Sequence, residues 1–281
     1  MARRSFKQCE ALVQRIYASV YKKVFTKSNL SAAVNGNRSI IESELLRLSL
    51  SDKYNEFCKQ FAKKLAKAGL SNHRGVWRKY FEAAKKNQII AISYTYSKFQ
   101  KDILKKLIDD NFSMIKSIPQ SIMKMYRHKF VDVLFDQTAI GSLSRGSFER
   151  QLRRHGAKNA KMIARTETAK LQTAIDRISS TKLGSPCYFW RATKDHRTRQ
   201  SHKSMEGVIV FWQDSQDNKP LLDNMHGDAG EFPNCRCDVE PIFDERDLTK
   251  STYLVYDYRK HKPVRMSKHA VLDLMEAGGF N

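Results

Sequence analysis

Apolar side chains recur every three to four residues over most of residues 1–180, a pattern typical of amphipathic helices. The run over 45–65 carries lysines between its apolar positions, and Gly69 predicts the end of that helix. The run over 77–118 contains no proline, so it predicts one long helix or two helices with a break near Asn87.

The same spacing predicts further helices over 122–140, 148–154 and 158–183. After Gly184-Ser185-Pro186 the pattern changes to short runs rich in aromatic and β-branched residues, which predict strands. We expect these strands from Cys187, over 207–212, over 237–243 and over 253–258, with a short helix over 267–276.

The sequence therefore predicts an α+β protein, with a mainly helical N-terminal region of long amphipathic helices followed by a small antiparallel-sheet C-terminal domain. We divide the chain into a basic helical region over 1–140, a helical connector over 141–184 and an α+β domain over 185–281. The connector contains the triplet Arg165-Thr166-Glu167.

Charge is distributed unevenly along the chain. It contains 51 Lys+Arg and 29 Asp+Glu, a net charge of +22. Residues 1–180 hold 36 of the basic and 14 of the acidic residues, whereas residues 181–281 hold 15 of each. Because the whole excess lies in the helical part, we expect that part to bind a polyanion, with nucleic acid as the first candidate. The alternatives are a solvated lysine-rich surface and contact with an acidic protein.

The basic clusters of the helical part are the candidate phosphate contacts. Nothing in their pattern is suited to reading bases, so we expect binding that does not depend on DNA sequence. The candidates are Arg3, Arg4, Lys22, Lys23, Lys63, Lys64, Lys67, Arg78, Lys79, Lys85, Lys86, Lys105, Lys106, Arg153 and Arg154.

The compartment is suggested by what the sequence lacks. No stretch approaches the run of about 18 uncharged apolar residues that a membrane span needs. The five cysteines are scattered and odd in number, which is not the pattern of a disulfide framework. We therefore expect a protein that is made and kept in a cytosol.

Histidine and cysteine are concentrated in the segment 188–243. Zinc prefers thiolate and imidazole ligands, and we take His202, His226, Cys235 and Cys237 as the candidate ligands. A Cys-x-Cys pair holds one metal less readily than a pair separated by two residues. The alternative is that both cysteines are partly buried in a β-hairpin, with His202 hydrogen-bonded to Asp195 or to a backbone carbonyl.

The same segment predicts a polar network that fixes the loop after the first strand, because arginine offers several donors and aspartate accepts more than one. Its candidate members are Arg165, Glu167, Asp195, Arg197, Arg199 and His202. The alternative is a metal-dependent nuclease or another enzyme that uses the region of Asp195, His202, Cys235 and Cys237. We favour a role without catalysis, because we find no carboxylate pair beside a histidine, no glycine-rich phosphate loop and no Gly-x-Ser-x-Gly motif.

Four pieces of sequence occur in a fixed order. They are Arg165-Thr166-Glu167, the aromatic strand ending in Trp190, Asp195-x-Arg197-Thr198-Arg199-x-x-His202 followed by Gly207, and Gly230-Glu231-x-Pro233-Asn234-Cys235-Arg236-Cys237 followed by Pro241. In order and spacing they resemble the phage Mu F-like minor head proteins, also called the SPP1-type head morphogenesis family.

The resemblance implies a virion component: a minor head protein in multiple copies inside the head near the portal, made in the host cytoplasm and associated with phage DNA. The implied partners are the portal protein and the major capsid or scaffold protein, and the implied process is genome packaging or ejection. Two alternatives stay open, a nuclease delivered with the virion and a host-derived basic scaffold protein that binds RNA.

Overall fold

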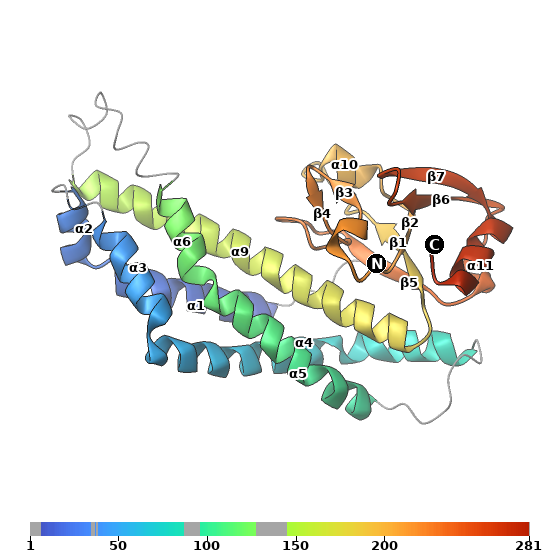
Figure 1. Ribbon diagram of the computed structural model, residues 1–281, viewed down its shortest axis with the longest axis horizontal. Coiled ribbons are helices and arrows are strands. Elements are labelled where there is room, and N and C mark those ends of the chain that lie inside the picture. Colours follow the sequence, from blue (N-terminus) through green and yellow to red (C-terminus); the bar gives the residue numbers. More distant parts are fainter. Residues whose placement is uncertain (1–6, 35–36, 38, 87–95, 128–144, 281) are drawn as a thin grey trace. The chain divides into compact units, whose positions relative to one another are not determined.

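The computed structural model describes residues 7–34, 37, 39–86, 96–127 and 145–280 (Figure 1). The helices of the first part are α1 (Lys7–Val24), α2 (Lys27–Val34), α3 (Ile40–Leu50), α4 (Asp52–Lys86), α5 (Tyr96–Lys116), α6 (Ile118–Tyr126) and α9 (Arg145–Lys182). The elements that follow are β1 (Cys187–Arg191), α10 (Gln200–Lys203), β2 (Ile209–Phe211), η2 (Gln216–Asn218), β3 (Leu221–Leu222), β4 (Met225–His226), β5 (Asp238–Ile242), η3 (Glu245–Asp247), β6 (Thr252–Asp257), β7 (Lys262–Ser267) and α11 (Lys268–Ala277). Among the helices described, none combines the length and the apolar composition that crossing a bilayer requires.

The predicted α+β class is confirmed, since long helices precede a small sheet. The predicted end of a helix at Gly69 is wrong, because α4 continues through this residue to Lys86. A Cβ atom at Gly69 would lie 3.0 Å from Leu171 Cδ2 and 3.2 Å from Ile175 Cδ1. Glycine at this position therefore allows close packing against α9 rather than ending α4.

The prediction of two short helices over 148–154 and 158–183 is also wrong, because α9 is one helix of 38 residues. Gly156 lies inside it and does not interrupt it; an isolated glycine costs a helix only about 1 kcal/mol. The predicted break near Asn87 and the part of the predicted 122–140 helix beyond Arg127 lie outside the described residues.

The chain separates into two compact units, whose boundaries fall inside α4, α5 and α9. The first, here called the helical unit, comprises Lys7–Ala68 and Leu104–Arg165. The second, here called the sheet unit, contains residues 69–86, 96–103 and 166–280 of the described chain. The predicted boundaries at 140 and 184 follow charge and sequence pattern, whereas these units follow contacts within the fold, so the predicted domains stay a prediction.

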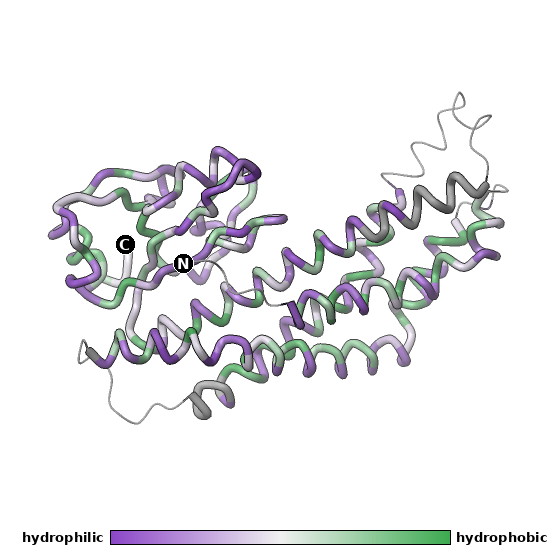
Figure 2. Tube along the Cα trace, turned by 180° about the vertical axis from the view of Figure 1, so that it is seen from behind, coloured by the Kyte–Doolittle hydropathy of each residue, from purple (hydrophilic) through white to green (hydrophobic). Residues whose placement is uncertain are grey.

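The helical unit is built around one apolar core. Ile16 and Tyr17 of α1, Leu45 of α3, Cys58 of α4 and Ile122 of α6 all belong to it, each at most 1% exposed. Figure 2 shows hydrophobic residues on one side of these helices and hydrophilic residues on the other. Amphipathic helices bury such a stripe against each other, which explains why this part of the chain folds.

The sheet unit contains a five-stranded sheet with the strand order β5-β1-β2-β6-β7. All its strand pairs are antiparallel except β2 with β6, which are parallel. Alternate residues of β1 belong to two different apolar cores. Tyr188 and Trp190 lie in one core, and Cys187 and Phe189 lie in the other. The sheet is therefore covered on both faces, on one of them by α11 through Val271.

Candidate functional site

A tight turn before β5 positions the two cysteines of the Cys-x-Cys pair. The backbone N–H of Cys235 donates to the carbonyl of Phe232 over 2.9 Å. Pro233 occupies the second position of this turn and Asn234 the third, with a φ of 56°. Proline followed by a residue of positive φ is the pattern of a type II turn. The Pro-Asn dipeptide therefore fixes the position of Cys235, the last residue of the turn.

His202 lies on α10 and meets both cysteine side chains. Its Nδ1 atom is 3.4 Å from the Sγ atom of Cys235 and 3.5 Å from the Sγ atom of Cys237. The imidazole packs edge to face against Trp190 and Phe232, with ring centroids 5.8 and 4.9 Å away. His202 is 3% exposed, and the two cysteines are 8% and 1% exposed. These three residues form a buried unit, here called the Cys–His cluster.

The two thiols of the cluster differ in acidity. The hydrogen bond with Cys237, and next the contact with His202, lower the pKa of Cys235 to about 4 despite its burial. The same hydrogen bond, burial and the charge of Cys235 raise the pKa of Cys237. The backbone N–H of Cys237 also donates to the Cys235 sulfur over 3.4 Å.

His226, the fourth candidate ligand, is engaged elsewhere. Its Nδ1 atom lies 3.0 Å from the carbonyl oxygen of Lys219, and its ring meets that of His261 at 5.8 Å. Among the His, Cys, Asp and Glu side chains of the described residues, those of the Cys–His cluster lie close enough together to hold one metal ion. Whether that cluster binds a metal stays a prediction here.

The predicted polar network divides into two networks around different partners. The Asp195 carboxylate accepts two hydrogen bonds from the Arg236 guanidinium, and another from the Thr198 hydroxyl over 3.0 Å. The Arg236 hydrogen bonds hold the pKa of Asp195 well below its usual range. Sequence reasoning missed Arg236, which lies 41 positions away and faces Asp195 only because β1 and β5 are neighbours.

Arg199 belongs to the second network, together with His202. Its guanidinium donates to Asp223 Oδ2 over 2.9 Å and to the carbonyl of Pro233 over 2.5 Å. Asp223 also accepts from the Ser201 hydroxyl and lies 3.6 Å from His202 Nε2. Asp195 and His202, the pair that a nuclease was expected to use, are thus held by different partners.

An open hollow of about 420 Å³ lies at the loop after β1. Its two carboxylates are those of Asp195 and Glu206, and each faces a cation. Asp195 is paired with Arg236, and Glu206 lies 3.5 Å from Lys194 Nζ. Glu206 also accepts from the backbone N–H of Ala192 over 2.6 Å. These contacts fix the loop, and they give the nuclease alternative no further support.

The middle residue of the Arg165-Thr166-Glu167 triplet makes the contact with the turn. The backbone N–H of Asn234 donates to the Thr166 hydroxyl over 3.0 Å, and Thr166 is 7% exposed. Arg165 is exposed and Glu167 pairs with Lys170 at 3.1 Å. Arg165 and Glu167, the expected network members, therefore make other contacts, and Thr166 between them holds the turn at Asn234.

A buried charge network, missed by sequence reasoning, holds the loop that precedes the turn. The ammonium group of Lys219 lies 3.0 Å from Asp228 and 2.8 Å from Glu231, and Tyr188 donates to Asp228 over 2.9 Å. Burial raises the pKa of Asp228. Burial also acts to lower the pKa of Lys219, but the two carboxylates outweigh it and the pKa is raised.

Residues 134–240 match the family described as "Phage Mu protein F like protein". Over these residues the chain is therefore similar to the phage Mu F-like family. An uncharacterized protein of Haemophilus influenzae strain Rd is 28% identical over 155 residues, 54% of this chain and 32% of that relative. The aligned part thus spans about a third of the relative's length. No solved structure matches the chain. The family assignment supports a phage head-related protein.

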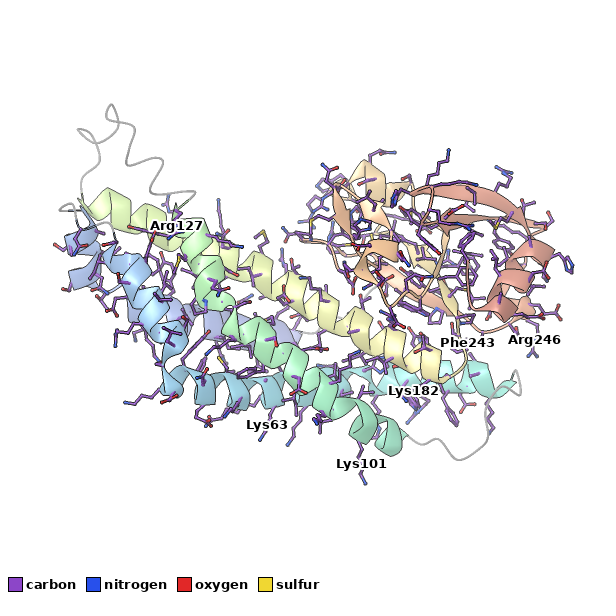
Figure 3. All side chains as sticks on the ribbon, viewed as in Figure 1. Lys63, Lys101, Arg127, Lys182, Phe243 and Arg246 are labelled. Carbon is purple, nitrogen blue, oxygen red and sulfur yellow. The ribbon has the colours of Figure 1, made fainter. Side chains whose placement is uncertain are left out.

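Most of the candidate phosphate contacts are exposed lysines and arginines of the helices. The exposed candidates are Lys22, Lys23, Lys63, Lys64, Lys67, Arg78, Lys79, Lys85, Lys105, Lys106 and Arg154. Figure 3 shows Lys63 pointing outward from α4. Arg3 and Arg4 lie outside the described residues, as do the side chains of Lys86 and Arg153.

The Mu F-like segment adds a basic row that sequence reasoning did not assemble. Arg154, Lys158, Lys161 and Arg165 are all exposed and follow each other along α9 at spacings of four, three and four residues. This spacing places the four cations on one face of the helix. We call this row, which lies entirely within the helical unit, the α9 stripe. The repeat of four and three residues was the available signal, and it was overlooked because adjacent pairs were sought instead.

Proposed function

We propose that this protein is a minor head protein of a tailed phage. It binds DNA through its basic helices without sequence preference and docks at the portal or capsid interior during head morphogenesis, packaging or ejection. The observation that carries the proposal is that the Mu F-like segment, 134–240, contains the α9 stripe in a chain of net charge +22.

The stripe suits a duplex by its dimensions. From Arg154 to Arg165 an α-helix rises about 16 Å, and each strand of a duplex carries one phosphate charge per about 3.4 Å of its axis. Four cations on one helical face can therefore meet phosphates of one backbone in succession. Such contacts release counterions and carry no base information, which fits binding to packaged DNA of any sequence.

The docking role falls to residues 185–281, which hold 14 basic and 15 acidic residues. Their arginines and lysines are largely matched to carboxylates of the same region, as in the Arg236–Asp195 and Arg199–Asp223 pairs. Such a domain has no electrostatic reason to approach DNA, and it suits contact with a folded protein. Cross-linking of intact particles, followed by mass spectrometry, tests this: links from 185–281 to portal or capsid protein support docking, and links from the helical unit alone contradict it.

DNA contact is tested by measuring duplex affinity against salt concentration for the full chain. In the stripe variant, Arg154, Lys158, Lys161 and Arg165 are all replaced by alanine. Its plot of log affinity against log salt should lose up to about 3.6 units of slope, about 0.9 per lost phosphate contact.

The matched control removes the same charge from four exposed residues of the C-terminal domain: Lys203, Lys250, Lys262 and Arg265. Its slope should stay close to that of the unaltered chain. Equal losses in both variants would mean that net charge alone draws the protein to DNA, and an unchanged stripe variant would contradict the assignment of the stripe.

A further inference from the structure

The Cys–His cluster has the dimensions of a metal site. Its three ligand atoms lie within 4.8 Å of one another, and His202 Nδ1 is 3.4 and 3.5 Å from the two sulfurs. Zinc binds sulfur at about 2.3 Å and imidazole nitrogen at about 2.0 Å, so a tetrahedral ion separates these two ligands by about 3.6 Å. We propose that His202, Cys235 and Cys237 bind one zinc ion through Nδ1 and the two Sγ atoms.

The surroundings of the cluster orient these ligands. The Nε2 atom of His202, on the far side of the ring from the sulfurs, lies 3.3 Å from Arg199 Nη1 and 3.6 Å from the Asp223 carboxylate, and Arg199 itself donates to Asp223. This Arg199–Asp223 pair behind the ring holds its orientation. On the cysteine side, the backbone N–H of Cys237 faces the Cys235 sulfur at 3.4 Å, a donor that stabilises a metal-bound thiolate.

The ligand set favours zinc over other ions. Two sulfurs and one imidazole are soft and borderline ligands, which calcium and magnesium do not choose. Three protein ligands leave the fourth position to solvent or a small ligand. Such an ion would join α10 to the turn before β5, because His202 and Cys235 lie 33 positions apart in the sequence. This site is independent of DNA binding.

The test is the metal content of the full chain, purified without chelators. We expect about one zinc per chain by mass spectrometry of the metal. Cobalt added to the zinc-depleted protein should give the sulfur-to-cobalt absorption of a thiolate site. Less than about a tenth of a zinc per chain after incubation with zinc, with both thiols still reactive toward a thiol reagent, would overturn the site. A disulfide between Cys235 and Cys237 in freshly purified protein would overturn it too.

Variants then locate the ion. Cys235→Ser and Cys237→Ser should lose the cobalt spectrum, whereas His226→Ala and Cys187→Ala should keep it. Cys187 is a buried cysteine of the opposite face of the sheet, and His226 is the histidine that the structure keeps out of the cluster. Loss of the spectrum in His226→Ala alone would move the site away from the cluster. Circular dichroism of each variant reports folding, and the cobalt titration of the unaltered chain holds whether or not a variant folds.

Discussion

Several lysines and arginines of the helical unit and of residues 185–281 (the predicted C-terminal domain) are placed differently. On α9 of the helical unit, Arg154, Lys158, Lys161 and Arg165 are exposed in a row. In the C-terminal domain, Arg236 is bound by Asp195, and Lys219 lies buried between Asp228 and Glu231. A cation that has an acidic neighbour in the fold contributes to the fold, whereas a row of exposed cations is available to a partner.

Net charge by itself does not distinguish these uses. Residues 181–281 contain 15 basic residues, so they are not poor in cations. What differs is the number of carboxylates around them and how deeply the pairs are buried. The difference predicts that removing a cation held between carboxylates, such as Lys219, weakens folding, and that charge removal on the α9 stripe weakens binding alone.

The largest effect on stability is expected at Lys219. Lys219→Met leaves Asp228 and Glu231 as two neighbouring carboxylates without their cation, and should lower the free energy of unfolding by about 3–5 kcal/mol. Urea denaturation measures it. Lys203→Met, at an exposed lysine of the same domain, is the control and should change stability by less than about 0.5 kcal/mol. Equal effects of the two substitutions would remove the distinction between folding and binding cations.

A smaller effect is expected where α9 meets the turn before β5. Thr166→Val removes the acceptor for the Asn234 N–H and should cost about 1 kcal/mol of stability. Glu167→Gln, one position later, loses only its exposed pair with Lys170 and should change stability by a few tenths of a kcal/mol. Urea denaturation of both variants decides which residue of the Arg-Thr-Glu triplet holds the turn. A larger loss in Glu167→Gln would return that role to the charged residue.

The Asp195–Arg236 pair should make stability depend on pH. Arg236 depresses the pKa of Asp195 in the folded chain, so the stabilisation is complete above the unfolded value, about 3.9, and is lost as the pH falls through the lower folded value. Asp195→Asn should flatten the dependence in that acidic range and leave the slope near pH 7 unchanged. Thermal unfolding at a series of pH values measures it, and identical curves for both proteins would show that the pair adds nothing.

The smallest effect on stability belongs to the α9 stripe. Replacing its four cations by alanine should shift the free energy of unfolding by less than about 1 kcal/mol, because exposed helical cations contribute little and alanine favours a helix. Urea denaturation checks this. A loss of several kcal/mol would mean that the row supports the fold, and its effect on DNA binding would then lose its meaning.

Much of the fold follows from local pattern. The spacing of apolar residues predicts amphipathic helices before residue 183 and strands after it, and the structure has both. Local pattern misled us at Gly69, because its role is contact with Leu171 and Ile175, about a hundred positions away. The same limit applies to His73 of α4, which is buried against Asp176 of α9 with 2.8 Å between Nε2 and Oδ1.

The candidate site shows the same limit. Composition alone draws attention to His202, Cys235 and Cys237, and the structure brings them together. Composition also suggests His226, whose Nδ1 atom faces the Lys219 carbonyl in the structure, because sequence proximity to Cys235 says nothing about the direction of a side chain. Asp223 and Arg236 were missed because their partners depend on the order of strands in the sheet, which the hydrophobic pattern does not give.

Lysine footprinting tests the central claim most directly. The full chain is acetylated briefly with and without duplex DNA at low salt, and mass spectrometry reads the modification of each lysine. We predict that DNA protects Lys158 and Lys161 of the α9 stripe and Lys63, Lys64 and Lys67 of α4, and leaves Lys203, Lys250 and Lys262 unchanged. Protection of the C-terminal lysines with the helical ones fully modified would contradict the account.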